Sequence, residues 1–217
     1  MSGKEENVVK IQVDSGFIEG NLRVPTSAKG MVLFAHGSGS SRFSPRNKYV
    51  AEVLNDAEIA TLLIDLLTKH EEQIDMGTRQ FRFDINLLTE RLLIAAEWLK
   101  NNSKTQTLKL GIFGSSTGAA AALIAAAKLP RDVVAVVSRG GRPDLAVDYL
   151  AEVRAPSLFI VGGRDTVVID LNQKAMVDVS AEKKLKIVPG ATHLFEEPGK
   201  LEEVAKLATA WFLKHLK

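Results

Sequence analysis

The sequence predicts a single α/β domain built on a mostly parallel, doubly wound sheet with helices on both faces. From residue 31 onward, short apolar segments alternate with longer segments of helical periodicity. The segments at residues 31–35 and 133–137 are wholly apolar, which is typical of strands buried on both faces. An order of strand then helix, repeated along a chain, favours a parallel sheet between two helical layers.

Length and composition limit the class of protein. The 217 residues supply enough core for one such domain, residues 1–217, and leave little room for a second. The net charge of +2 is spread without a basic stripe, so we expect no nucleic-acid partner. Cysteine is absent, which excludes disulfides, thiolate catalysis and Cys-ligated metals.

The N-terminus predicts the compartment. Residues 1–6 are polar and lack the apolar core of a signal peptide. No apolar run approaches the length of a membrane-spanning helix. We therefore expect a cytoplasmic protein that does not contact a membrane.

The first third of the chain predicts a hairpin, a buried strand and a helix. Residues 8–13 and 17–24 alternate in hydropathy around a turn at residues 14–16, which indicates an antiparallel hairpin at the sheet edge. The buried strand at residues 31–35 leads into a small, flexible loop, residues 36–41. Ser44 followed by Pro45 is typical of a helix start.

The rest of the chain repeats the strand–helix order. Residues 59–64 form a strand, and residues 67–83 are polar and irregular, without a predicted element. Asp84 can cap a long amphipathic helix. An Ala-rich helix ends at Pro130, and the remaining elements are strands at residues 133–137, 157–161 and 183–188 and a closing amphipathic helix at residues 201–216. No inserted segment is long enough to form a cap domain.

The segment Gly114-Ser115-Ser116-Thr117-Gly118 fits the pattern G-x-S-x-G between an apolar strand and the Ala-rich helix. In that pattern the central serine occupies a strained turn with its hydroxyl exposed above the sheet. Glycines flank it because a Cβ there would collide with neighbouring chain. The pattern predicts Ser116 as a nucleophile; Ser115 would fit only if the turn shifted by one residue.

A serine nucleophile needs a base and an acid, and both follow later strands. His193 follows the strand at residues 183–188 and is the predicted base, because its ordinary pKa lies near neutrality. Asp165 follows the strand at residues 157–161 and is predicted to orient the imidazole, although it could instead cap the next helix. Asp144 is the alternative acid.

Two backbone N–H groups are predicted to form an oxyanion hole. The N–H of Thr117 directly follows the nucleophile, and the N–H of Ser38 lies in the loop after an adjacent strand. Because these donors are backbone groups, we expect the side chains at both positions to matter less than the loop geometry. His36 is expected to brace this loop.

Two arginines and several glycines and histidines are further candidates for binding roles. Arg139 and Arg142 are candidate substrate-binding residues that could hold an anionic group, with a structural ion pair as the alternative role for each. No histidine pair has metal-ligand spacing, so no metal is expected. Arg42 replaces the third glycine of a dinucleotide fingerprint, and no P-loop occurs.

Four segments together resemble the α/β-hydrolase fold, and the compact layout resembles the dienelactone hydrolase-like family from about residue 8 to the end of the chain. The segments are His36-Gly37-Ser38-Gly39, residues 114–118, Gly162-Gly163-Arg164-Asp165 and Pro189-Gly190-Ala191-Thr192-His193. The resemblance implies a three-layer hydrolase without a cap. Dienelactone hydrolases carry a cysteine nucleophile where this chain has Ser116, so the resemblance favours carboxylic esters over dienelactone itself.

These observations predict a serine hydrolase that cleaves a small-molecule carboxylic ester without a cofactor. Lactones, thioesters and amides share the same tetrahedral intermediate and stay open as substrates. The alternative from another class is a non-catalytic protein that keeps this scaffold to bind a small ligand or to regulate a partner. Such a protein would be expected to lack the nucleophile, the base or the acid, whereas Ser116, His193 and Asp165 are all present.

Overall fold

The computed structural model describes residues 6–217. This part of the chain forms one eight-stranded sheet in the order β1-β2-β4-β3-β5-β6-β7-β8. The strands are β1 (Asn7–Val13), β2 (Gly16–Arg23), β3 (Met31–Ala35), β4 (Ala60–Ile64), β5 (Leu110–Ser115), β6 (Val133–Arg139), β7 (Ser157–Gly162) and β8 (Lys183–Val188). The helices are α1 (Pro45–Asp56), α2 (Lys69–Thr78), α3 (Ile85–Asn101), α4 (Thr117–Lys128), α5 (Thr166–Met176) and α6 (Lys200–His215), with a 3-10 helix over Pro143–Glu152.

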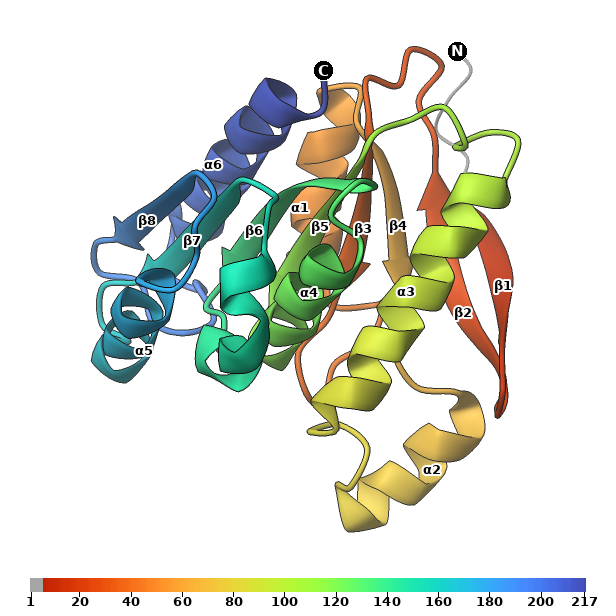
Figure 1. The fold of residues 1–217 in the computed structure, drawn as a ribbon, viewed down its shortest axis with the longest axis horizontal. Coiled ribbons are helices and arrows are strands. Elements are labelled where there is room, and N and C mark those ends of the chain that lie inside the picture. The colour runs from red at the N-terminus through yellow and green to blue at the C-terminus, as the bar shows by residue number, and fades with distance from the viewer. Residues whose placement is uncertain (1–5) are drawn as a thin grey trace.

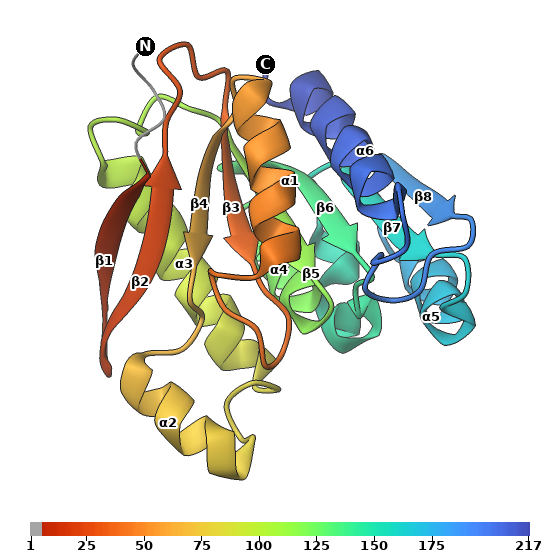
Figure 2. The ribbon, with the colours of Figure 1, turned by 180° about the vertical axis from the view of Figure 1, so that it is seen from behind.

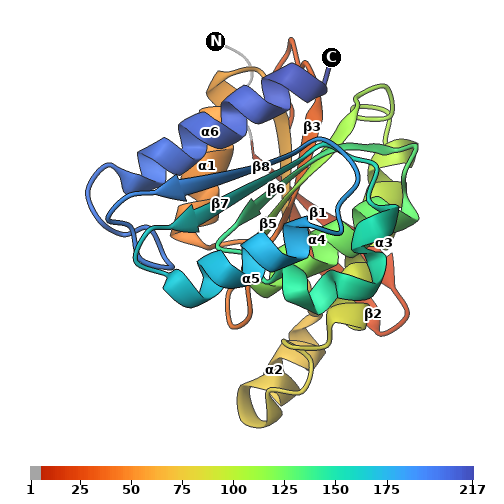
Figure 3. The same cartoon turned by 60° about the vertical axis from the view of Figure 1, so that its left-hand side comes forward.

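The molecule has three layers, as predicted. Helices α3, α4 and α5 cover one face of the sheet (Figure 1). Helices α1 and α6 pack side by side on the other face, which Figure 2 shows from behind. Seen from the side, the sheet lies between the two helical layers (Figure 3). Each face buries its own apolar cluster against these helices.

The strand directions confirm the doubly wound arrangement with an antiparallel hairpin. β1 pairs antiparallel with β2, and β2 pairs antiparallel with β4. From β4 to β8 every neighbouring pair is parallel. The carboxyl ends of the parallel strands therefore meet at one edge, where loops from different strands can build a site.

Helix α4 is the central helix. Every residue from Thr117 to Ala127 is buried, because the 3-10 helix and α3 cover the sides that the sheet leaves open. A helix that is apolar all round is stable only in such a position. Its small alanines let it lie close to the sheet, and its N-terminus is fixed directly behind Ser116.

The segment at residues 67–83 departs from the prediction, because it contains α2. Thr68 and Glu71 form a capping box, with the Thr68 hydroxyl accepting from the Glu71 N–H and the Glu71 carboxylate accepting from the Thr68 N–H. Arg91 of α3 then donates to Glu71 at 2.8 Å, and both side chains are buried. This ion pair fastens α2 beyond the carboxyl end of β4 (Figure 1).

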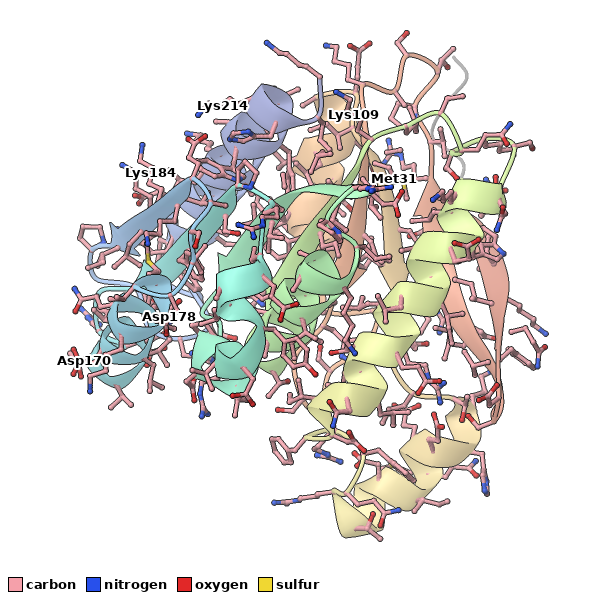
Figure 4. The ribbon with its side chains drawn as sticks, viewed as in Figure 1. Met31, Lys109, Asp170, Asp178, Lys184 and Lys214 are labelled. Atoms are coloured by element: carbon pink, nitrogen blue, oxygen red, sulfur yellow. The ribbon has the colours of Figure 1, made fainter. Side chains whose placement is uncertain are left out.

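The far edge of the sheet is polar. β8 forms it, and Lys184 projects outward there in Figure 4. Lysines on an edge strand oppose pairing with another chain. No helix within residues 6–217 has both the length and the apolar character needed to cross a membrane.

Candidate active site

Ser116 occupies a sharp turn between β5 and α4. Its backbone is in the left-handed region, with φ 51° and ψ −122°. Such a conformation costs about 1–3 kcal/mol for a residue with a Cβ. Its N–H donates to the Arg139 carbonyl at 3.1 Å, and its own carbonyl accepts from the N–H of Arg142 at 3.2 Å. The end of β6 and the residues just after it thus hold the strained serine in place.

The two flanking glycines allow the turn to form. A Cβ on Gly114 would lie 2.4 Å from the Cα of Ala119. A Cβ on Gly118 would lie 2.4 Å from the His36 carbonyl oxygen and 2.6 Å from that of Ala35. These neighbours are backbone atoms that cannot rotate away. The expected reason for the Gly spacing is therefore correct.

Asp165 and His193 are in direct contact. The Nδ1 of His193 lies 2.6 Å from Asp165 Oδ2, a distance at which Nδ1–H donates to the carboxylate. Asp165 sits at the start of α5, yet its side chain makes no capping bond there. The carboxylate accepts a hydrogen bond from the imidazole and none from the backbone at the start of the helix. Asp165 therefore does not cap α5 through its side chain.

Asp144, the alternative acid, is engaged elsewhere. Its two carboxylate oxygens accept from Arg142 Nε at 2.9 Å and from Nη2 at 2.7 Å. Arg142 is therefore in the structural ion pair that was its alternative role, and this ion pair raises the pKa of Arg142 through its hydrogen bonds to Asp144.

Ser116 and His193 line the same pocket, which measures about 230 Å³. The predicted nucleophile and the predicted base thus face the same small space, at the carboxyl edge of the sheet. 

A second hollow, of about 260 Å³, lies on the other side of the loop at residues 36–41. The two hollows share Gly37, Ser38 and Ser40.

A side chain connects the predicted oxyanion loop, residues 36–41, to the turn between β5 and α4 that carries Ser116, called the elbow below. The Ser38 N–H donates to the Thr117 hydroxyl at 3.0 Å. The Thr117 hydroxyl therefore helps to hold the loop beside Ser116, a contact that the sequence did not indicate. An N–H can be shared between two acceptors, so the same group can also face an oxyanion.

His36 braces this loop, as predicted. The Leu66 N–H donates to His36 Nε2 at 3.0 Å, so Nδ1 carries the ring proton and donates to the Gly37 carbonyl at 2.9 Å. Burial lowers the pKa of His36, which keeps the ring neutral. A neutral imidazole in this tautomer satisfies both neighbours and links the loop to the end of β4.

Arg139 is buried without an acidic partner, unlike Arg142. Its Nε lies 3.4 Å from the Ser115 hydroxyl and its Nη2 lies 3.5 Å from Asn47 Oδ1. Within residues 6–217, no carboxylate lies within ion-pair distance of it. The ion-pair alternative therefore does not apply to Arg139.

Sequence reasoning missed two pocket residues, Arg46 and Asn47. Both lie in the first turn of α1 and line the pocket with Ser116. Asn47 is buried and accepts from the Ser115 hydroxyl at 3.0 Å. The available signal was the polar first turn of α1, which directly follows the loop at residues 36–44.

The loop at residues 36–44 is also anchored from the far side. Arg42 is buried, donates from Nη2 to Glu19 at 2.7 Å and forms an ion pair with Asp65. Asp65 and part of α2 line the second hollow, together with Leu66 and Leu67. Asp65 and α2 therefore form one wall of this second hollow.

Comparison with known proteins identifies the family. The family model of the dienelactone hydrolase family matches residues 46–216. The chain belongs to the dienelactone hydrolase family. The crystal structure of a dienelactone hydrolase from Anabaena variabilis ATCC 29413 is 57% identical to the chain, covers 98% of it and 99% of its own length, and has a TM-score of 0.97. The family and its fold support a hydrolase.

A solved structure with a much lower sequence identity has the same fold as this chain. XC6422 from Xanthomonas campestris, an α/β serine hydrolase without a lid, is 19% identical with a TM-score of 0.78, and the match covers 99% of this chain and 96% of that one. The likeness agrees with the predicted three-layer hydrolase fold without a lid.

One relative of this chain is much longer than the chain itself. The "Putative phosphoribosyl transferase" of Mycobacterium tuberculosis (strain ATCC 25618 / H37Rv) is 56% identical over 209 residues, which are 95% of this chain and 46% of that protein. The chain thus spans about half the length of this relative.

Proposed function

We propose that the chain is a serine hydrolase that cleaves small carboxylic esters through an acyl-enzyme on Ser116. One observation carries the proposal. His193 shares a pocket with Ser116 and bonds Asp165 through its other ring nitrogen at 2.6 Å. This is the relation that a nucleophile, a base and an orienting acid require.

In the proposed reaction, Ser116 Oγ attacks the ester carbonyl while His193 Nε2 takes its proton. Asp165 holds Nδ1–H, which fixes the tautomer and stabilises the imidazolium that forms. The C–O bond of the ester then breaks, and His193 gives its proton to the leaving alcohol. Water, activated by the same imidazole, releases the acid from Ser116.

The N–H groups of Thr117 and Ser38 are proposed to stabilise the oxyanion of the tetrahedral intermediate. Thr117 begins α4, so its amide lies at the positive end of the helix dipole. Each such donor typically contributes a few kcal/mol to the transition state. The bond from Ser38 to the Thr117 hydroxyl supports this role, since it holds one donor beside the other.

A fluorophosphonate probe tests the proposal directly. The full chain is expected to react covalently with the probe, and Ser116→Ala is expected to abolish labelling because it removes the attacking oxygen. Ser115→Ala, which removes the neighbouring hydroxyl, is the matched control and is expected to retain labelling. Labelling that survives Ser116→Ala, or a wild-type chain that never labels, would refute the proposal.

Pocket size predicts the acyl preference. A volume of about 230 Å³ lies below the range of about 300–1,000 Å³ typical of pockets for drug-sized ligands. In a series of p-nitrophenyl esters, kcat/KM is therefore expected to be highest for short acyl groups and to fall as the chain lengthens. A kcat/KM that rises steadily up to an acyl length of about twelve carbons, as continued burial of CH₂ groups would produce, would contradict the expectation.

A further inference from the structure

The pocket beside Ser116 is rich in hydrogen-bond donors and positive charge. Five serines line it together with Arg46, Asn47 and Arg139, and within residues 6–217 no aspartate or glutamate lines it. The five are Ser38, Ser40, Ser44, Ser115 and Ser116. An uncharged ester would use few of these groups.

Arg139 is the strongest sign that an anion belongs here. The residue is only 7% exposed, and its Nη1 has no hydrogen-bond partner in the described chain. Burial and the nearby charge of Arg46 lower the pKa of Arg139 to about 10, so the guanidinium remains protonated at neutral pH. A buried cation without a counter-charge is costly, and an anion in the pocket would offset that cost.

Arg46 supplies a second cation from the N-terminus of α1. Its Nη1 donates to Glu196 at 2.8 Å, but the Glu196 side chain is 61% exposed. An ion pair with so exposed a partner contributes little and can be exchanged for a bound anion. The amides and dipole of the first turn of α1 add to the positive potential on the same side of the pocket.

Free hydroxyls complete the set of donors. The side-chain oxygens of Ser38 and Ser40 have no hydrogen-bond partner within the described residues. They lie on the loop after β3, whereas Arg46 belongs to α1 and Arg139 to β6. Donors therefore approach the pocket from three separate segments.

We propose that this pocket takes esters that carry a phosphate group, which Arg46, Arg139 and the Ser40 hydroxyl bind while Ser116 attacks the neighbouring ester carbonyl. The phosphate is bound and not cleaved; only the acyl C–O bond breaks. The two negative charges of a phosphate monoester match the two positive charges of the guanidinium groups. Its three non-bridging oxygens can accept hydrogen bonds from donors on three separate segments. A carboxylate has one charge and two oxygens in a plane, which suit a single arginine.

Binding of inorganic phosphate, measured by titration calorimetry on the full chain, tests the proposed phosphate site without relying on catalysis. Phosphate is expected to bind at millimolar concentration or below, and Arg46→Gln is expected to raise Kd at least about tenfold, the loss of a charge-assisted hydrogen bond. Glu196→Gln removes the competing carboxylate and is expected to tighten binding. Arg154→Gln, an exposed arginine before β7, is the matched control and is expected to change Kd less than about twofold.

Three outcomes of the titration overturn the proposal. They are a wild-type chain that does not bind phosphate, acetate binding as tight as phosphate binding, and equal losses in Arg46→Gln and Arg154→Gln. Because Arg139 is buried, Arg139→Lys is compared only after its thermal unfolding has been checked, and Arg46→Gln carries the test alone if that variant does not fold.

The kinetic test rests on the proposed serine hydrolase activity and compares three aryl acetates. They are 4-acetoxyphenyl phosphate, 4-acetoxybenzoate and 4-acetoxybenzamide, which differ only in the group opposite the ester. Arg46→Gln is expected to lower kcat/KM for the phosphate at least about tenfold more than for the amide. Equal losses on all three, or a larger loss on the carboxylate, would overturn the proposal. If no acetate is hydrolysed but phosphate binds, the hydrolase assignment fails and the phosphate site stands.

Discussion

Asp165→Asn is expected to lower kcat for a small ester by about three to four orders of magnitude, with little change in stability. The Asp165 carboxylate accepts from His193 Nδ1–H at 2.6 Å, which leaves Nε2 free to take the serine proton. An amide can instead donate to Nδ1 and so favour the tautomer with its proton on Nε2. That tautomer cannot act as a base toward Ser116.

The measurement is kcat for a short p-nitrophenyl ester, with thermal unfolding as a check on the fold. Asp144→Asn is the matched control, because it removes a carboxylate of the same type that holds Arg142 and not His193. The ion pair of Asp144 is partly exposed and contributes at most about 1 kcal/mol. We expect kcat of this variant within about threefold of wild type. A larger loss in Asp144→Asn than in Asp165→Asn would show that the acid is wrongly assigned.

Much of the fold follows from local patterns. The run at residues 31–35 is apolar at every position and became β3 with those same bounds. Asp84 accepts from the Leu87 N–H and starts α3 as predicted, because capping depends only on neighbours in sequence. The positions of the proposed site residues could be predicted for a related reason. Each comes just after a strand, and a parallel sheet brings those strand ends together.

What escaped prediction depended on weak or distant signals. Helix α2 is short and mostly polar, and only the spacing of Thr68 and Glu71 marked its start. Arg139 and Arg142 are three residues apart, yet one has a carboxylate partner and the other has none. Such a difference arises from which segments meet around a buried side chain, and no local pattern contains that information.

Gly118→Ala is expected to lower both stability and activity. The new Cβ would lie 2.4 Å from the His36 carbonyl oxygen and 2.6 Å from the Ala35 carbonyl oxygen. Since these are backbone atoms at the end of β3, the elbow and the oxyanion loop must move apart. We expect a loss of about 3 kcal/mol in the free energy of unfolding, which corresponds to a fall in Tm of about 6–12 °C for a chain of this size.

The loss of activity in Gly118→Ala should exceed what the loss of stability explains. The shift separates the Ser38 N–H from the Thr117 hydroxyl, which now lie 3.0 Å apart, and a displacement of about 1 Å near the reacting atoms can cost about a hundredfold in rate. The measurement is kcat/KM well below the Tm of the variant.

Gly77→Ala is the matched control for the glycine substitution. Its Cβ would meet nothing within 4 Å in α2, so the same added methyl should raise stability by about 0.5–1 kcal/mol through helix propensity. Opposite shifts in Tm for the two variants follow if the elbow owes its shape to close backbone contact. Equal shifts would mean that the loop at residues 36–41 moves to accept a methyl group. The proposed oxyanion donors would then be held in position only by the Thr117 hydroxyl and by His36.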